Sequence, residues 1–266
     1  MTASRGGYTA HTWWKTVGAV VVVCAATAIA LPAQTFTTLA NFAGTGGTDP
    51  LQISLAQGTD GNLYGTTLTG PNNSGTGSGT IFMVTPAGTL TTLYSFGGAD
   101  GAKPYAGLVL GTDSNFYGTT AYGGAHGYGN VFKITPAGVL TTMHSFDSTD
   151  GAGPYGGLAQ ATSGIFYGTT YGGGTSYQGT VFSLAVGLGP FVTTLPTSGK
   201  VGATVRILGT NLTGATSVTF NGTAAVFTVI SPTLISTIVP AGATTGTVQV
   251  TTPSGTLTSN VSFTVP

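Results

Sequence analysis

Charged residues are scarce in this chain, and glutamate is absent. Six basic and six acidic residues make up 5% of the 266 positions, and every acidic residue is an aspartate. A chain so poor in lysine and arginine offers no positive surface for the phosphate backbone of a nucleic acid. We therefore expect no nucleic-acid partner.

Cysteine is nearly absent too, and so are the common catalytic motifs. The single cysteine, Cys24, can form no disulfide within the chain. The sequence contains no Gly-x-Ser-x-Gly elbow, no phosphate-binding loop and no pair of histidines at metal-ligand spacing. These absences predict a protein that is not an enzyme and holds no cofactor.

Residues 1–33 have the composition of a secretory signal peptide. Basic residues precede an uncharged, largely apolar run at 16–31. This run is shorter than the roughly 20 residues that a membrane-spanning helix needs. Small residues at Ala30 and Ala33 suit cleavage after either position. We expect a mature chain that is secreted or held at the outer cell surface, with no integral membrane span.

A pattern of about fifty residues occurs three times between positions 34 and 187, which is typical of tandem-repeat proteins. Each copy contains Tyr-Gly-Thr-Thr, at 64–67, 117–120 and 167–170, and a later phenylalanine, at Phe82, Phe132 and Phe182. The middle copy has four short apolar stretches separated by turn residues, at 107–110, 116–119, 131–134 and 140–146. We expect four-stranded β units, with Tyr64, Tyr117 and Tyr167 packed in the core.

The ends of the repeat region indicate how the array closes. The fourth-strand pattern of 90–96 and 140–146 also occurs at 36–42, whereas the third copy stops after its third strand. We predict a propeller-like array in which 36–42 pairs beside 181–184 and closes the ring. A trefoil, a β-prism, and a homodimer that forms a ring of six units stay open as alternatives.

After residue 190 the repeats end and Val, Thr and Ile begin to alternate. About seven short strands are expected over 190–266, which predicts a small immunoglobulin-like β-sandwich. The predicted fold class is therefore all-β: a three-repeat, propeller-like array of four-stranded units followed by a C-terminal immunoglobulin-like sandwich.

Two family resemblances cover nearly all of the mature chain. Residues 190–266 resemble an IPT/TIG domain through four segments: Pro-Thr-Ser-Gly at 196–199, Gly-Thr-Asn-Leu at 209–212, Val-Thr-Phe-Asn-Gly at 218–222 and Val-Pro-Ala-Gly at 239–242. Residues 35–186 resemble the GloVer glycine-rich tandem repeat of secreted bacterial proteins, through Tyr-Gly-Thr-Thr, the glycines at 123–124 and 172–174, and Gly-Thr-Val-Phe at 179–182. The first resemblance implies an immunoglobulin-like spacer or docking module. The second implies a bacterial surface or secreted protein and assigns no catalytic residue.

The connections between the second and third strands of each repeat, at 69–78, 121–128 and 171–178, vary most between copies. They carry aromatic and histidine side chains amid glycine: Tyr122, His126, Tyr128, Tyr171 and Tyr177. Aromatic side chains on loops can stack on sugar rings, so we predict these five as ligand-binding residues. Packing of the loops against a neighbouring repeat is the alternative. The predicted partner is a polysaccharide or a surface protein.

Asp100 and Asp150 occupy matching positions of the first two repeats. Carboxylates repeated around an array could bind Ca²⁺, but each turn supplies one carboxylate where calcium needs six to eight oxygens. A role in stabilising the turns is therefore favoured. The sequence predicts a secreted or surface-bound, non-enzymatic binding or structural protein. The alternative is a carbohydrate-active enzyme, or its accessory subunit, that uses these aspartates.

Overall fold

The computed structural model describes residues 35–42, 47–51, 53–70 and 78–266. The predicted signal peptide at 1–33, with Cys24, lies outside the described residues, as does most of the loop at 69–78. The described residues form strands and turns, with no helix among them, so the all-β prediction is confirmed. No described segment is a helix of the length and apolarity needed to cross a bilayer. Contacts divide the chain into Met1–Thr37 and Thr38–Pro266.

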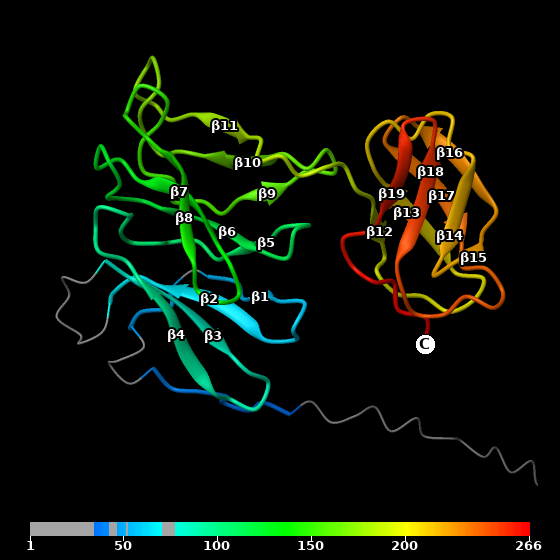
Figure 1. Cartoon of the computed structure of the whole chain (residues 1–266), viewed down its shortest axis with the longest axis horizontal. Helices are drawn as coiled ribbons and strands as arrows, with labels where there is room; N and C mark the ends of the chain where they lie inside the picture. Colours follow the sequence, from blue (N-terminus) through cyan, green and yellow to red (C-terminus); the bar gives the residue numbers. More distant parts are fainter. Residues whose placement is uncertain (1–34, 43–46, 52, 71–77) are drawn as a thin grey trace, which may run out of the picture. The chain divides into compact units, whose positions relative to one another are not determined.

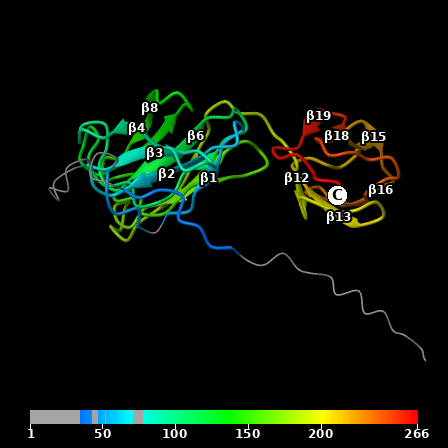
Figure 2. The same ribbon diagram turned by 90° about the horizontal axis from the view of Figure 1, so that it is seen from below.

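The three repeats form three antiparallel sheets. The first has the order β1 (Ala56–Gln57), β2 (Leu63–Thr67), β3 (Thr80–Val84) and β4 (Leu90–Ser95). The second repeats it as β5 (Val109–Leu110), β6 (Phe116–Thr120), β7 (Asn130–Ile134) and β8 (Leu140–Ser145). The third has β9 (Ala159–Gln160), β10 (Phe166–Thr169) and β11 (Val181–Leu184). Figure 1 shows the sheets one above another, and they overlap when viewed from below in Figure 2.

A glycine in the second strand of each sheet lets the sheet pack closely. A Cβ atom at Gly118 would lie 2.6 Å from Cζ of Phe132 and 2.9 Å from Cδ2 of Leu108. Gly65 and Gly168 meet the equivalent phenylalanine and leucine in their own repeats at similar distances. The recurring Tyr-Gly-Thr-Thr pattern thus leaves room for a phenylalanine from the next strand.

Aromatic pairs hold the first sheet against the second and the second against the third. Tyr64 stacks on Phe116 with ring centroids 4.1 Å apart, and Tyr117 stacks on Phe166 at 4.2 Å. A second pair recurs at the ends of the fourth strands, where Phe96 meets Phe132 at 5.4 Å and Phe146 meets Phe182 at 5.2 Å. No repeat encloses a core alone, because each core lies between two sheets.

The hydroxyls of Tyr64, Tyr117 and Thr66 at these junctions have hydrogen-bond partners. The Tyr64 hydroxyl donates to Oδ2 of Asp60 at 2.8 Å, and the Tyr117 hydroxyl donates to Oδ2 of Asp113 at 3.0 Å. The Thr66 hydroxyl donates across the junction to the Ala106 carbonyl at 3.0 Å. A tyrosine buried between sheets can therefore keep its hydrogen bond.

The prediction that residues 36–42 pair beside β11 and close the ring is wrong. β11 is the edge strand of its sheet, and residues 35–42 form no strand. Phe42 packs edge-on against Phe82 of the first sheet, with ring centroids 5.0 Å apart. This contact repeats the pairs made by Phe96 and Phe146. Residues 38–42 thus take the place that a fourth strand would have before the first sheet, far along the array from β11 (Figure 1).

Residues 190–266 form a β-sandwich of two four-stranded sheets. One has the order β12 (Thr193–Leu195), β13 (Thr204–Leu208), β17 (Leu234–Ile238) and β16 (Phe227–Ser231). The other has β15 (Thr223–Ala224), β14 (Ser217–Phe220), β18 (Val248–Thr252) and β19 (Gly255–Thr258). Alternate residues such as Val205, Ile207, Val248 and Val250 point into one shared core. The predicted sandwich is confirmed.

Candidate functional site

Three of the predicted ligand-binding tyrosines gather in one cleft of the repeat array. Its volume is about 280 Å³. The lining includes Tyr122 and Tyr128 from the second repeat and Tyr171 from the third. Tyr155, from the connection between the two repeats, completes the aromatic lining. We refer to these four tyrosines and the space between them as the tyrosine cleft.

Backbone hydrogen bonds fix the segments that carry the tyrosine cleft. The Tyr122 N–H donates to the Ala102 carbonyl at 3.0 Å, and the Ala102 N–H donates back at 2.7 Å. The Gly153 N–H donates to the Tyr128 carbonyl at 2.9 Å, and the Tyr171 N–H donates to the Gly153 carbonyl at 2.9 Å. The aromatic residues therefore stand on paired backbone, so a ligand entering this cleft would meet loops that are already ordered.

Tyr155 lies at the centre of the aromatic contacts. Its ring centroid is 5.7 Å from that of Tyr171 and 6.0 Å from that of Tyr122, both nearly perpendicular. The ring centroid of Tyr105, its counterpart one repeat earlier, lies 4.9 Å away. These distances are typical of edge-to-face aromatic packing. Tyr155 thus ties together residues from three parts of the array.

A hydrogen bond between two phenol groups raises the pKa of Tyr155. The hydroxyls of Tyr122 and Tyr155 form a short hydrogen bond. This bond, with partial burial, raises the pKa of Tyr155 to about 12. The Tyr155 phenol is protonated at neutral pH, as an ordinary tyrosine is, and the raised pKa extends this state to more alkaline pH. Each hydroxyl can donate to or accept from a bound ligand.

The tyrosine cleft is neutral and open to solvent. Tyr122 and Tyr128 are 46% and 43% exposed, and Tyr171 is 81% exposed. The remaining lining residues are alanine and glycine. Such a surface offers flat apolar ring faces and hydroxyl groups and no ionic contact. It suits a neutral ligand with an apolar face and several hydroxyls.

Two of the predicted residues lie outside the tyrosine cleft. Tyr177 is 75% exposed at a positive φ of 56°, and its N–H donates to the Gly174 carbonyl at 3.1 Å. His126 is exposed and near Asp147. The hydroxyl and backbone of Thr149 hold the pKa of Asp147 below its usual range, and His126 adds a smaller effect. Neither Tyr177 nor His126 contributes to the cleft lining.

The sequence analysis missed Tyr155 and Tyr105. Both follow a proline, in Pro104-Tyr105 and Pro154-Tyr155, fifty positions apart. This recurrence is a signal in the sequence. A proline after glycine or lysine is also typical of a plain turn, so the recurrence by itself does not mark a binding site.

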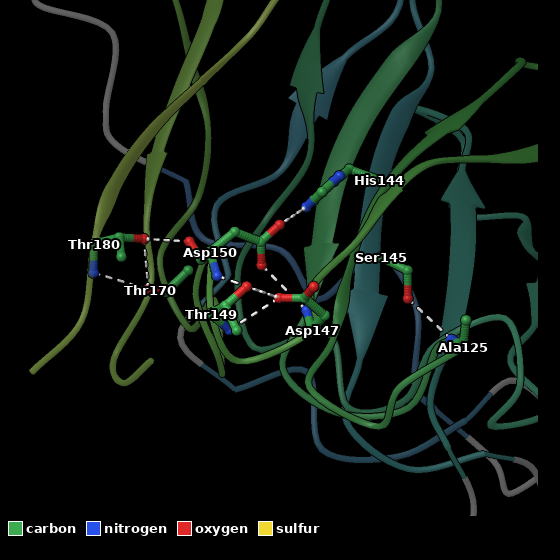
Figure 3. Close-up of polar contacts among 8 residues, drawn as sticks. All are labelled: Ala125, His144, Ser145, Asp147, Thr149, Asp150, Thr170 and Thr180. Atoms are coloured by element: carbon green, nitrogen blue, oxygen red, sulfur yellow. Dashed lines mark hydrogen bonds and ion pairs between the residues drawn. The ribbon is translucent and has the colours of Figure 1, made fainter. Parts of the chain in front are cut away.

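Asp100 and Asp150 each stabilise the loop that follows a fourth strand. Oδ1 of Asp100 accepts from the Gly97 N–H at 2.8 Å, and its Oδ2 accepts a short hydrogen bond from Tyr94. Oδ1 of Asp150 accepts from the Asp147 N–H at 3.1 Å, and its Oδ2 lies 2.7 Å from Nε2 of His144 (Figure 3). The two arrangements are alike, with tyrosine in one repeat and histidine in the other.

This likeness favours a structural role for both carboxylates. The hydrogen bond to Asp100, followed by burial, raises the pKa of Tyr94 to about 12, so that residue is a hydrogen-bond donor at neutral pH. A cavity of about 210 Å³ adjoins His144 and Asp150, lined otherwise mainly by apolar residues such as Phe146 and Phe182. In the part of the chain that the structure describes, no three His, Cys, Asp or Glu side chains are grouped as metal ligands would be.

The fold is that of an all-β tandem-repeat protein, and its second and third repeats meet at a cleft lined by tyrosines. The model of the Gloeobacter/Verrucomicrobia repeat matches residues 19–230. The chain therefore belongs to the Gloeobacter/Verrucomicrobia repeat family. No curated protein matches the chain significantly.

One solved structure with a match is a novel fungal alcohol oxidase with catalytic diversity among the AA5 family, in complex with copper. It is 13% identical to this chain, with a TM-score of 0.34. The alignment covers 77% of this chain and 51% of the oxidase, so the chain spans about half the length of that protein.

Proposed function

We propose that this chain is a secreted or surface-bound, non-enzymatic protein that binds a neutral polysaccharide in the tyrosine cleft. The observation that supports this most is the convergence of Tyr122, Tyr128, Tyr155 and Tyr171 on one neutral, open cleft. These residues come from two repeats and from the connection between them.

The chemistry of a sugar matches this cleft. A pyranose ring carries C–H groups on its faces and hydroxyls at its rim. The exposed ring of Tyr171 offers a flat apolar surface for such a face, and the phenols of Tyr122 and Tyr155 offer hydrogen bonds to the rim. The absence of charged side chains from the lining favours neutral sugars over uronic acids.

The proposed lack of enzymatic activity rests on the aspartates. Hydrolysis of a glycosidic bond commonly needs two carboxyl groups about 5 to 10 Å apart on either side of the bond. Asp100 and Asp150 lie in separate repeats, and each carboxylate already accepts two hydrogen bonds within its own loop region. Calcium has no part in the proposed function.

The segments at the two ends fit a surface protein. Residues 1–33 would direct secretion, with cleavage after Ala33 or Ala30. The C-terminal sandwich carries the IPT/TIG-like segments and would serve as a spacer or docking module. The repeat array would then present the tyrosine cleft to polysaccharide outside the cell.

An array of neutral and acidic glycans, probed with the secreted protein, tests the proposal. We expect binding to one or more neutral polysaccharides, strongly reduced by Tyr122→Ala and by Tyr171→Ala. Tyr177→Ala is the matched control, because it removes an exposed tyrosine outside the cleft. The absence of glycan binding, or binding that the cleft variants leave intact, would contradict the proposal.

The same samples test the enzymatic alternative. Incubation of any bound polysaccharide with the protein should release no new reducing ends. Release that is abolished by Asp150→Asn, in a variant that still folds, would instead support a carbohydrate-active enzyme.

A further inference from the structure

The C-terminal end of the array has an uncovered face. Tyr167 is 42% exposed, whereas its counterparts Tyr64 and Tyr117 are each 1% exposed. Val181 is 79% exposed, whereas Ile81 and Val131, at the same position of earlier repeats, are fully buried. The third sheet therefore presents the same apolar positions as the first two sheets, without a following sheet to cover them.

The N-terminal end of the array has an uncovered face that is complementary to the one at the C-terminal end. Leu55 is 47% exposed, although its counterparts Leu108 and Leu158 are 5% and 6% exposed. It lines an apolar groove of about 360 Å³ beside Phe42 and Phe82. In the second and third repeats a preceding sheet covers this position. At the first sheet, the described residues 38–42 lie where a preceding fourth strand would be, and Phe42 packs on Phe82.

The strands are complementary as well. The third sheet ends at β11 and lacks a fourth strand, while residues 36–42 carry the fourth-strand pattern and form no strand. Phe42 already packs on Phe82 as Phe96 packs on Phe132. Each chain thus has a fourth-strand segment at one end and needs one at the other.

We propose that two copies of this chain associate head to tail, with residues 36–42 of one copy pairing along β11 of the other. The interface would continue the one that joins successive repeats within the chain. Ile81 lies opposite Tyr94, and Val131 lies opposite His144. The same register places Val181 of one copy opposite Ala40 of the other.

The proposed contact between two copies is weaker than the contacts between successive repeats within one chain. Tyr167 meets Leu63, which holds the position of Phe116 and Phe166 in the other repeats. Ser163 stands where Asp60 and Asp113 accept the tyrosine hydroxyl. A smaller apolar partner and a missing carboxylate make the association reversible and dependent on concentration.

A head-to-tail interface leaves free surfaces at the outer ends unless the rotation closes a ring. Two copies supply six sheets, a number within the range of closed β-propellers. The second copy would provide both missing neighbours at once, so a closed dimer leaves neither Leu55 nor Val181 exposed.

Disulfide trapping tests the predicted register. The full chain would carry Cys24→Ser with Ala40→Cys and Val181→Cys, and would be oxidised at a concentration that supports association. We expect a disulfide-linked dimer at a yield well above that of either single-cysteine variant. Loss of both thiols in a monomer would show closure within one chain and overturn the proposal. A yield no higher than that of the single-cysteine variants would overturn it too.

Light scattering during gel filtration gives a second readout without cysteine. We expect the wild-type mass to rise from one to two chains with concentration, and Val181→Lys to remain at one chain. Val226→Lys is the matched control, because Val226 is 83% exposed on the C-terminal sandwich. A wild-type protein that stays monomeric at all concentrations, or a Val226→Lys variant as monomeric as Val181→Lys, would overturn the proposal.

Discussion

The second and third repeats carry the same strand sequence, Phe-Tyr-Gly-Thr-Thr, but its tyrosine is buried in one repeat and exposed in the other. Tyr117 is 1% exposed and Tyr167 is 42% exposed. Val131 is fully buried and Val181 is 79% exposed. The difference comes from the following sheet, which covers the second repeat and is missing after the third. In this array the neighbour decides which residues form the core, so identical sequences contribute unequally to stability.

The polar residues beside these two tyrosines also differ between the second and third repeats. Asp113 accepts the hydroxyl of the buried Tyr117, while Ser163 occupies the matching position beside Tyr167. A buried hydroxyl needs a protein partner, whereas an exposed one can use water. The carboxylate is therefore present where the neighbour excludes solvent and absent where solvent is available.

The largest expected effect is at the centre of the covered repeat. Phe132 is fully buried and contacts Phe96. Phe132→Ala should lower the free energy of unfolding by about 3 to 5 kcal/mol, because it leaves a cavity between two sheets. Phe182→Ala, at the partly exposed counterpart, should cost clearly less. Urea unfolding measures both, and a loss below about 1 kcal/mol for Phe132→Ala would contradict the assigned packing.

A valine pair isolates the effect of the neighbour from that of the sequence. Val131→Ala should cost about 2 kcal/mol, since the methyl groups removed lie in the core. Val181→Ala should stay within about 0.5 kcal/mol, as expected for a surface position. The unfolding free energies should be measured at a protein concentration low enough to avoid association. Equal losses in the two variants would break the comparison.

A smaller effect on stability is expected from removal of the tyrosine hydroxyls. Tyr117→Phe removes the donor to Asp113 and should cost about 1 kcal/mol. Tyr167→Phe should be close to neutral, because Tyr167 is 42% exposed and Ser163 replaces the carboxylate. Thermal or urea unfolding of both variants checks this. A greater loss for Tyr167→Phe than for Tyr117→Phe would reverse the comparison.

The last effect concerns alkaline pH. Burial, followed by the hydrogen bond to Asp60, raises the pKa of Tyr64 to about 12, above the value of about 10 in unfolded chains. The contribution of Tyr64 to the free energy of unfolding has its full value below pH 10. It is lost as the pH rises toward 12, because in this interval the unfolded chain releases the phenol proton and the folded chain keeps it. Wild type should lose more stability over this interval than Tyr64→Phe. Equal losses of stability in wild type and Tyr64→Phe would contradict the raised pKa of Tyr64.

Local features of the fold could be predicted from the sequence. The predicted strands at 116–119 and 131–134 correspond to β6 and β7 within one residue, because turn residues and apolar periodicity define strands locally. The place of 36–42 could not be predicted, since its pattern fits any position that follows a third strand. Its contact with Phe82 depends on the three-dimensional course of the chain.

The candidate site could be predicted in part, because some of its residues are marked by local sequence and others are not. Tyr122, Tyr128 and Tyr171 lie in loops that differ between repeats, and that difference is visible in the sequence. Tyr155 belongs to a turn after a proline that recurs between repeats, and it joins the cleft because two repeats meet there. Residues at a junction between sheets are determined by packing rather than by their own segment.

The most direct test of the central claim is the affinity of the protein for a polysaccharide that it binds, compared between Tyr171→Ala and Tyr177→Ala. Both side chains are at least 75% exposed, so neither change should affect folding. We predict that Tyr171→Ala weakens binding about tenfold or more, a loss of about 1.4 kcal/mol, and that Tyr177→Ala binds like wild type. Equal affinities in the two variants would contradict the assignment of the tyrosine cleft as the binding site.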